Sequence, residues 1–103
     1  MSVHLGSFRT AGHLEPPRAT ALRAGAVRLP ARGMMDWHTT GTREELILLV
    51  SGGVTLEIET GRRRQRFPLA PGRCAWLPPA TRDRVVNRAT KTARYVYVTA
   101  QCP

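Results

Sequence analysis

A chain of 103 residues has room for one modest hydrophobic core and for no second module. Its 42% hydrophobic and 22% charged residues are typical of a globular protein. The sequence contains no apolar run of about 18 residues, the length that a membrane-spanning helix needs. Residues 1–17 also lack the apolar stretch of a secretory signal. We therefore expect one cytoplasmic domain that does not enter a membrane.

The net charge of +9 is the strongest feature of the composition, since 16 basic residues face seven acidic ones. A basic domain can bind nucleic acid or an acidic partner. The arginines are spread along the chain, however, and only residues 62–66 form a cluster, with no aromatic side chains among them to stack on bases. We therefore expect a solvated hairpin at this cluster and no nucleic-acid partner.

Residues 1–20 include Pro16-Pro17 and predict an irregular arm or a short edge strand, followed by a single domain over residues 21–103. Residues 19–25 are the only stretch with some helical character, and Gly25 interrupts it. Beyond this point the sequence predicts strands separated by turns. We expect strands over residues 34–40, 45–50, 54–59, 62–69, 74–77, 84–87 and 94–98.

Two of these expected strands differ in how they should be buried. Residues 45–50 are apolar on both faces, which is typical of a strand between two sheets. In residues 54–59 the apolar side chains Val54, Leu56 and Ile58 alternate with polar ones, which predicts one wet face. Short strands with turn residues at regular intervals predict an all-β sandwich or barrel.

The two cysteines, Cys74 and Cys102, have neither metal-ligand spacing nor a C-x-x-C arrangement. We interpret both as free thiols. A disulfide between them stays open at the level of sequence.

Two stretches carry a family resemblance. The first is His38-Thr39-Thr40, four residues, Glu45, six residues and Gly52; the second is Gly72, five residues, Pro78-Pro79-Ala80, two residues, Asp83, three residues and Asn87. They resemble the two signature motifs of the cupin superfamily in every internal spacing. The resemblance covers about half of the chain, residues 33–87. It implies an antiparallel jelly-roll β-barrel of the small single-domain, conserved-barrel type.

The residue types depart from the family pattern where a metal would bind. Metal-binding cupins hold the ion with three histidines and a glutamate. Here His38 and Glu45 are kept, Thr40 replaces the second histidine and Asp83 replaces the third; Ala80 replaces the motif's glycine. If the fold is a cupin, the resemblance implies that His38, Thr40, Glu45 and Asp83 converge inside the barrel.

One imidazole and two carboxylates could form a three-ligand site for a divalent cation, Fe, Mn or Zn, with positions left open for water or substrate. His38, Glu45 and Asp83 are the candidate ligands, and Thr40 could contact a bound water. In the alternative, Asp83 points toward the guanidinium of Arg82 or Arg84 and the barrel has a polar pocket without metal.

Two function classes follow from the resemblance. The first is a cupin that binds a small molecule in a polar barrel pocket, with or without a divalent metal. The second is a metal-dependent enzyme of dioxygenase or isomerase type, with the same three ligands and catalytic residues that the sequence does not identify. The resemblance further implies a homodimer in which residues before position 20 pack on a partner chain.

Three neighbouring features complete the predicted site. His38 and Thr40 are expected to share a strand face with Met34 and Asp36. Trp37 is on the opposite face, where we expect it in the core between the sheets, with a dimer surface as the alternative. Trp76 either lines the rim of the pocket or packs as an ordinary apolar residue.

Overall fold

The computed structural model describes residues 3–14, 16 and 18–103. Within them the chain forms nine β-strands and no helix. The strands are β1 Gly12–His13, β2 Leu22–Leu29, β3 Met34–Thr39, β4 Arg43–Ser51, β5 Val54–Thr60, β6 Arg63–Leu69, β7 Cys74–Leu77, β8 Arg82–Val86 and β9 Ala93–Gln101. The described part of the chain therefore holds no helix that could cross a membrane.

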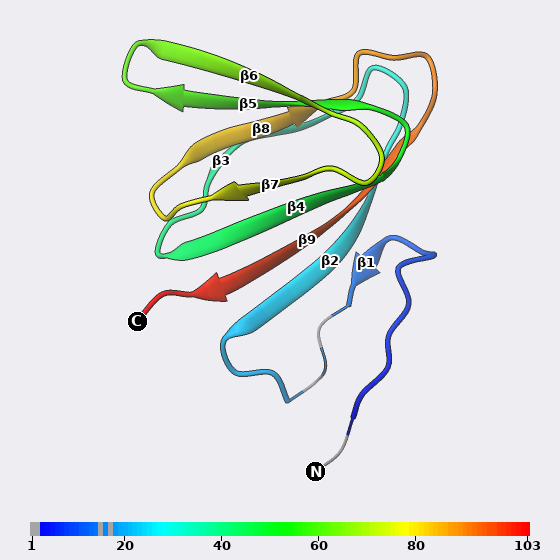
Figure 1. The fold of residues 1–103 in the computed structure, drawn as a ribbon, viewed down its shortest axis with the longest axis vertical. Helices are drawn as coiled ribbons and strands as arrows, with labels where there is room; N and C mark the ends of the chain where they lie inside the picture. The colour runs from blue at the N-terminus through cyan, green and yellow to red at the C-terminus, as the bar shows by residue number, and fades with distance from the viewer. Residues whose placement is uncertain (1–2, 15, 17) are drawn as a thin grey trace.

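The strands form two antiparallel sheets that face one another (Figure 1). One sheet has the order β1-β2-β9-β4-β7 and the other the order β3-β8-β5-β6. Consecutive strands β3 and β4 therefore belong to opposite sheets, and so do β7 and β8. This crossing of the chain between the sheets is what brings residues of the two sequence motifs together. The predicted antiparallel jelly-roll arrangement is confirmed.

The helical character of residues 19–25 is not realised, because this stretch enters strand β2 instead. All eight residues of β2 pair with β9, from Leu22 opposite Ala100 to Leu29 opposite Ala93. Ladder hydrogen bonds with a long neighbouring strand outweigh a weak local helix preference. Gly25 has a packing reason: the ring of Tyr97 lies over it, and an added Cβ would approach the ring atom Cε1 to 2.7 Å.

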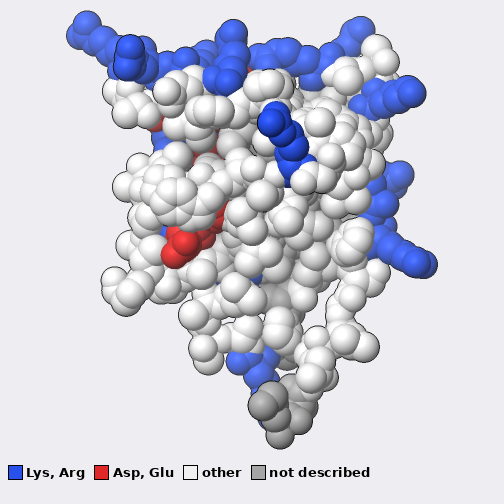
Figure 2. All heavy atoms as spheres, viewed as in Figure 1, with Lys and Arg blue, Asp and Glu red and all other residues white. Residues whose placement is uncertain are grey.

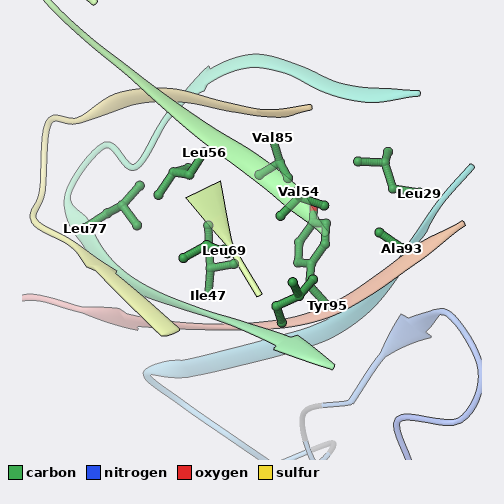
Figure 3. Packing of buried hydrophobic residues seen from close by; sticks show 10 residues of the cluster. Leu29, Ile47, Val54, Leu56, Leu69, Leu77, Val85, Ala93 and Tyr95 are labelled. Carbon is green, nitrogen blue, oxygen red and sulfur yellow. The ribbon is translucent and has the colours of Figure 1, made fainter. Parts of the chain in front are cut away.

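The core lies between the two sheets, as Figure 3 shows for side chains from both layers. β5 contributes Val54 and Leu56, and β4 contributes Ile47 and Leu49, all nearly inaccessible to solvent. Alternation predicted the two positions in β5. The prediction that residues 45–50 are buried on both faces is wrong, because β4 packs on the opposite sheet with one face only and Val50 is 37% exposed. The cluster is completed by Leu29, Leu69, Leu77, Val85, Ala93 and Tyr95.

Trp37 lies outside this core, so the prediction of a core position between the sheets is wrong. It is half-buried on the outer face of the β3-β8-β5-β6 sheet. The guanidinium carbon of Arg84 lies 4.7 Å from the centre of its ring, and two more arginines lie slightly farther away. A ring on this outer face is covered by cations instead of by the opposite sheet.

Two motif positions have a backbone reason for glycine. Gly52 has φ +79°, and a Cβ there would approach Cα of Ala93 to 2.8 Å. Gly72 has φ +85° at the turn before β7. Ala80 also adopts a positive φ of 57°, so the residue that replaces the motif's third glycine keeps a backbone conformation that favours glycine.

The second motif ends in a buried amide that joins two connections, the one between β2 and β3 and the one between β8 and β9. Asn87 is fully buried, and its Nδ2 donates to the backbone oxygens of Leu29, Pro30 and Lys91. Its Oδ1 accepts from the backbone N–H of Ala89. This asparagine therefore fixes the connections at one end of the barrel.

Both cysteines are free, as predicted from their spacing: Cys74 is exposed and Cys102 is partly exposed.

Candidate metal centre

Three of the four predicted site residues converge inside the barrel from three strands. His38 on β3 and Asp83 on β8 are direct cross-strand partners in one sheet. Glu45 comes from β4 in the opposite sheet. One potential ligand atom from each residue lies within 4.8 Å of the other two. Such a separation allows one cation to contact all three atoms.

The imidazole of His38 is oriented by the backbone of its own strand. Its Nδ1 lies 3.1 Å from the carbonyl oxygen of Asp36, and because a carbonyl oxygen only accepts, Nδ1 carries the hydrogen. In the neutral ring, Nε2 therefore presents a lone pair. This atom lies 3.4 Å from Oδ1 of Asp83. A backbone carbonyl on the other ring nitrogen is the usual support of a metal-bound histidine.

The carboxylate of Asp83 is buried and lacks hydrogen-bond donors. The residue is fully inaccessible to solvent, and neither Oδ1 nor Oδ2 has a hydrogen-bond partner among the described residues. Buried carboxylate oxygens are ordinarily hydrogen-bonded, since leaving one unsatisfied costs about 1–3 kcal/mol. A cation between Asp83 and Nε2 of His38 would satisfy both lone-pair donors.

The pKa values of Glu45 and Asp83 are both raised, as expected for buried carboxyl groups without a strong positive neighbour. Burial, and to a lesser extent the nearby Asp83, raise the pKa of Glu45 to about 7, while His38 acts in the opposite direction. Burial also raises the pKa of Asp83, and His38 again opposes the shift. Both groups therefore lack a positive neighbour strong enough to balance their desolvation. The residues present fit a divalent cation.

The alternative in which Asp83 points toward a neighbouring arginine is wrong. Arg82 and Arg84 project to the outer face of the sheet, because side chains alternate along β8. There Nε of Arg82 contacts Glu59 at 3.2 Å, and Nε of Arg84 contacts Glu57 at 3.0 Å. Asp83 therefore projects from the inner face of its sheet, toward His38 and Glu45 and away from both arginines.

Thr40 lies beside the three residues, but its hydroxyl is engaged elsewhere. Oγ1 donates to the carbonyl oxygen of Pro78 at 2.8 Å and accepts from the backbone N–H of Thr81 at 3.0 Å. The threonine thus ties the end of β3 to the loop between β7 and β8. Thr40 therefore occupies a ligand position of the motif, but its hydroxyl stabilises the loop instead of facing the three converging residues.

Two cavities flank the three residues and could admit a small molecule. One of about 400 Å³ is lined by His38, Glu45 and Asp83 together with mostly apolar side chains. The other, of about 300 Å³, is bordered by His38, Glu45 and Thr40, and it also contains Arg23 and Arg43. Tyr97 lines both.

Sequence reasoning missed the residues that give the smaller cavity its charge. Arg43 is held in place: its Nε donates to Thr99 Oγ1 and its Nη2 to the carbonyl oxygen of Ala21. Arg23 is exposed on β2, across the cavity mouth. No local motif marks either arginine, since the pairing of β2 and β4 with β9 alone brings them together.

Trp76 does not line either of these cavities. It is 61% exposed on β7, and its Nε1 donates to Oε1 of Glu44 at 3.0 Å. It borders a larger cavity of about 970 Å³ between the edge strands β6 and β7, which contains neither His38, Glu45 nor Asp83. We therefore place the candidate site at the three converging residues, where the unsatisfied polar groups are.

No family model matches the sequence. No curated protein matches it either. Solved structures do match. A Cupin 2 conserved barrel domain protein from Salinispora arenicola is 20% identical with a TM-score of 0.76, over 89% of this chain and 75% of that one. A predicted oxalate decarboxylase from Thermotoga maritima is 14% identical with a TM-score of 0.78, over 89% and 79%.

The cupin domain of Schizosaccharomyces pombe Cnp3 is 14% identical with a TM-score of 0.78, over 89% of this chain and 60% of that one. The chain also spans 51% of peruvianin-I from Thevetia peruviana latex, so it corresponds to only part of the length of some of these proteins. At such identities the likeness concerns the fold, and fold alone does not assign an activity. The protein has the cupin fold.

Proposed function

We propose that the barrel binds a small polar molecule through a divalent cation held by His38, Glu45 and Asp83. The observation that carries this proposal is the fully buried carboxylate of Asp83, which has no hydrogen-bond partner in the described part of the chain and lies 3.4 Å from Nε2 of His38. Without a cation or a proton at this point, the ionised carboxylate would be desolvated with no partner. A cation supplies the missing partner.

The chemistry of the ligand atoms narrows the cation. One imidazole nitrogen and two carboxylates suit hard or borderline ions such as Fe, Mn or Zn. Three protein ligands leave coordination positions for an oxygen of a bound molecule. When bound, the ion would act as a Lewis acid toward that oxygen. Nδ1 of His38, held by the carbonyl oxygen of Asp36, keeps the ring in the tautomer that ligation requires.

The neighbouring cavity favours a ligand that carries an anionic group. Arg23 and Arg43 lie in the cavity of about 300 Å³ that also borders His38 and Glu45. A small molecule could then contact the cation through an oxygen at one end and the Arg23 guanidinium through a carboxylate at the other. We propose a small carboxylic acid as the ligand class.

Turnover is the second candidate function, with the same three ligands in a metal-dependent enzyme of dioxygenase or isomerase type. It is favoured by the open coordination positions, and a predicted oxalate decarboxylase is among the similar folds. A steady conversion of bound ligand by the metal-loaded protein would support this function. Stoichiometric binding without any product would support binding alone.

The decisive experiment measures metal in the purified protein after reconstitution with Fe²⁺, Mn²⁺ or Zn²⁺. We expect about one ion per chain in the wild type and a strong loss in Asp83→Asn and His38→Ala. His4→Ala is the matched control, because His4 lies in the N-terminal arm. A wild-type protein that stays metal-free in all three ions would contradict the proposal.

We also propose a homodimer built through the N-terminal arm. The arm exposes three apolar side chains: Val3 is 81% exposed, Leu5 88% and Phe8 53%. Exposed apolar groups of this size favour contact with another surface. Light scattering should give twice the chain mass, and Leu5→Ser with Phe8→Ser should shift the protein toward monomer. A monomeric wild type would contradict this part of the proposal.

A further inference from the structure

The outer face of the β3-β8-β5-β6 sheet gathers arginines that are distant in sequence. Figure 2 shows basic side chains in a row along the side of the molecule where β5 and β6 lie in Figure 1. We call the outward-facing set on this sheet and at its end the arginine face. It comprises Arg64 and Arg66 from β6, Arg82 and Arg84 from β8, and Arg88 after β8.

Two glutamates on β5 hold these guanidinium groups in place. Glu57 is fully buried beneath them and contacts Arg84 at 3.0 Å, Arg66 at 3.3 Å and Arg88 at 3.3 Å. Glu59 contacts Arg82 at 3.2 Å and Arg64 at 3.6 Å. Each glutamate therefore serves more than one arginine, and the face keeps an excess of positive charge.

Trp37, from the edge strand β3, forms a platform for three of these arginines. The guanidinium carbons of Arg84, Arg64 and Arg82 lie 4.7, 5.2 and 5.3 Å from the centre of its ring. Cation–π contacts of this kind hold a guanidinium flat against the ring. Together with the glutamates, they reduce the side-chain entropy that a ligand would otherwise have to offset on binding.

The arginines are anchored and still accessible. Arg66 is 62% exposed, while Arg82 and Arg88 are each 53% exposed. Within the described residues, Arg66 and Arg82 each hydrogen-bond to a glutamate through Nε, which leaves their remaining N–H donors for solvent or a ligand. Planar guanidinium groups with free donors match the oxygens of a phosphate in a bidentate manner.

We propose that the arginine face binds the phosphodiester backbone of a nucleic acid, independently of base sequence. Three features of the face favour this occupant. Its excess positive charge complements a chain that carries one negative charge at each nucleotide. Its surface is polar and cationic, as protein–nucleic acid interfaces are. Trp37 is covered by guanidinium groups, so bases have no free ring to stack on, and recognition would rest on phosphate contacts.

Other occupants fit the face less well. A second copy of the chain would bring the same positive excess against it, and like charges repel across an interface. The cores of protein–protein interfaces are enriched in apolar and aromatic side chains, and on this face the ring of Trp37 is already covered by guanidinium groups. The inference departs from the expectation drawn from the dispersed arginines of the sequence. It is also separate from the proposed metal site, since Asp83 projects to the opposite side of the same strand.

The test measures binding of fluorescein-labelled single-stranded and duplex oligonucleotides by anisotropy at several salt concentrations. We expect binding by the wild type whose affinity falls steeply with salt and depends little on sequence. The variant R64Q/R82Q/R88Q should lose at least about tenfold in affinity at low salt, and its slope of log K against log salt should fall by about 2–3. Circular dichroism and thermal unfolding verify that it is folded.

A matched control removes the same charge elsewhere. R28Q/R32Q/R73Q lowers the net charge equally at exposed positions outside the arginine face and should bind nearly as the wild type does. Equal losses in both triple variants, or no binding by the wild type, would overturn the proposal. So would displacement of the oligonucleotide by polyglutamate at equal charge concentration, because it would assign the face to acidic polypeptides.

Discussion

His38 and Asp83 are cross-strand partners whose facing atoms, Nε2 and Oδ1, lie 3.4 Å apart without a hydrogen bond to Asp83. Both atoms present lone pairs when the imidazole is neutral and the carboxyl group is ionised. Glu45 adds a third lone-pair donor from the opposite sheet. The arrangement is unfavourable without a cation or a proton, and this conflict makes the site testable by substitution and by pH.

The substitution Asp83→Asn should have opposite effects on stability and on metal binding. It removes a buried, uncompensated negative charge, so the metal-free protein should become more stable by about 1 kcal/mol. It also removes a ligand atom, so divalent-cation affinity should fall by about 100-fold or more. Urea denaturation and isothermal titration calorimetry measure the two effects. A variant that is less stable without metal and still binds the ion would refute this account of Asp83.

The stability of the metal-free protein should fall as the pH rises from about 5 to about 8. The pKa of Glu45 is raised from 4.5 to about 7, so the fold favours the protonated form. Its contribution is fully present below the unfolded-state pKa and is lost as the pH rises through the folded-state value. A bound cation competes with this proton, so metal affinity should increase over the same range. Thermal unfolding at several pH values measures the trend.

Glu45→Gln serves as the control for this pH dependence. It keeps the shape of the side chain and removes the titrating group, so the dependence should become flatter. A wild-type protein whose metal-free form gains stability over this range would rule out the assignment.

Glu57→Gln should destabilise the protein, because it leaves three arginines without their shared anion. Removing one partner of a buried ion pair costs about 3–5 kcal/mol; since two of the three arginines are more than half exposed, we expect about 2 kcal/mol. Glu59→Gln, whose side chain is 31% exposed, is the control and should cost less than about 1 kcal/mol. Urea denaturation of both variants gives the comparison.

The lowered pKa of Glu57 predicts that the protein loses stability in acid. Hydrogen bonds from Arg84 and its neighbours lower the pKa of Glu57 from 4.5 to about 2. Its stabilising contribution is present above the unfolded-state pKa and is lost as the pH falls from about 4.5 toward 2. The wild type should therefore lose stability over this range, and Glu57→Gln should show less of that loss. Equal acid sensitivity in both proteins would show that Glu57 is not responsible.

Ala80→Gly should stabilise the protein. Ala80 has φ 57°, a conformation that costs an alanine about 1–2 kcal/mol, whereas glycine adopts it freely. The greater freedom of glycine in the unfolded chain offsets about 0.4–1 kcal/mol of the gain. A net stabilisation of about 0.5–1 kcal/mol should appear in urea denaturation. Ala70→Gly, at a position without positive φ, should not stabilise.

The sequence alone was sufficient for the strands from β3 onward and for the turns between them, but not for all of β2. Alternation in residues 54–59 and turn glycines act over a few residues, so they can be read along the chain. The placement of His38, Glu45 and Asp83 at one site was implied by the resemblance of the motif spacing to the cupins, because these residues lie on three separate strands. The identities of Thr40 and Asp83 left open whether the site would hold a cation.

The orientation of β3 depended on the tertiary structure. We expected Met34 and Asp36 to share the inner face with His38. Asp36 does border the cavity of about 400 Å³ together with His38, but Met35 lies there in place of Met34. The register shifts between Met35 and His38, so that Met35 pairs with the inward-facing Val85 and His38 with Asp83. A bulge inserts one residue and changes which side chains face the core. It is decided by pairing with β8, which no local pattern reveals.

Long-range pairing likewise decided what surrounds the site. It turned residues 22–25 into part of a strand, placed Trp37 under the guanidinium groups of Arg64, Arg82 and Arg84, and joined Arg23 and Arg43 at one cavity. Local sequence determines which segments become strands and turns, because backbone preferences act between near neighbours. Which strands pair, and in which register, depends on burying one common core, and only the folded chain shows the result.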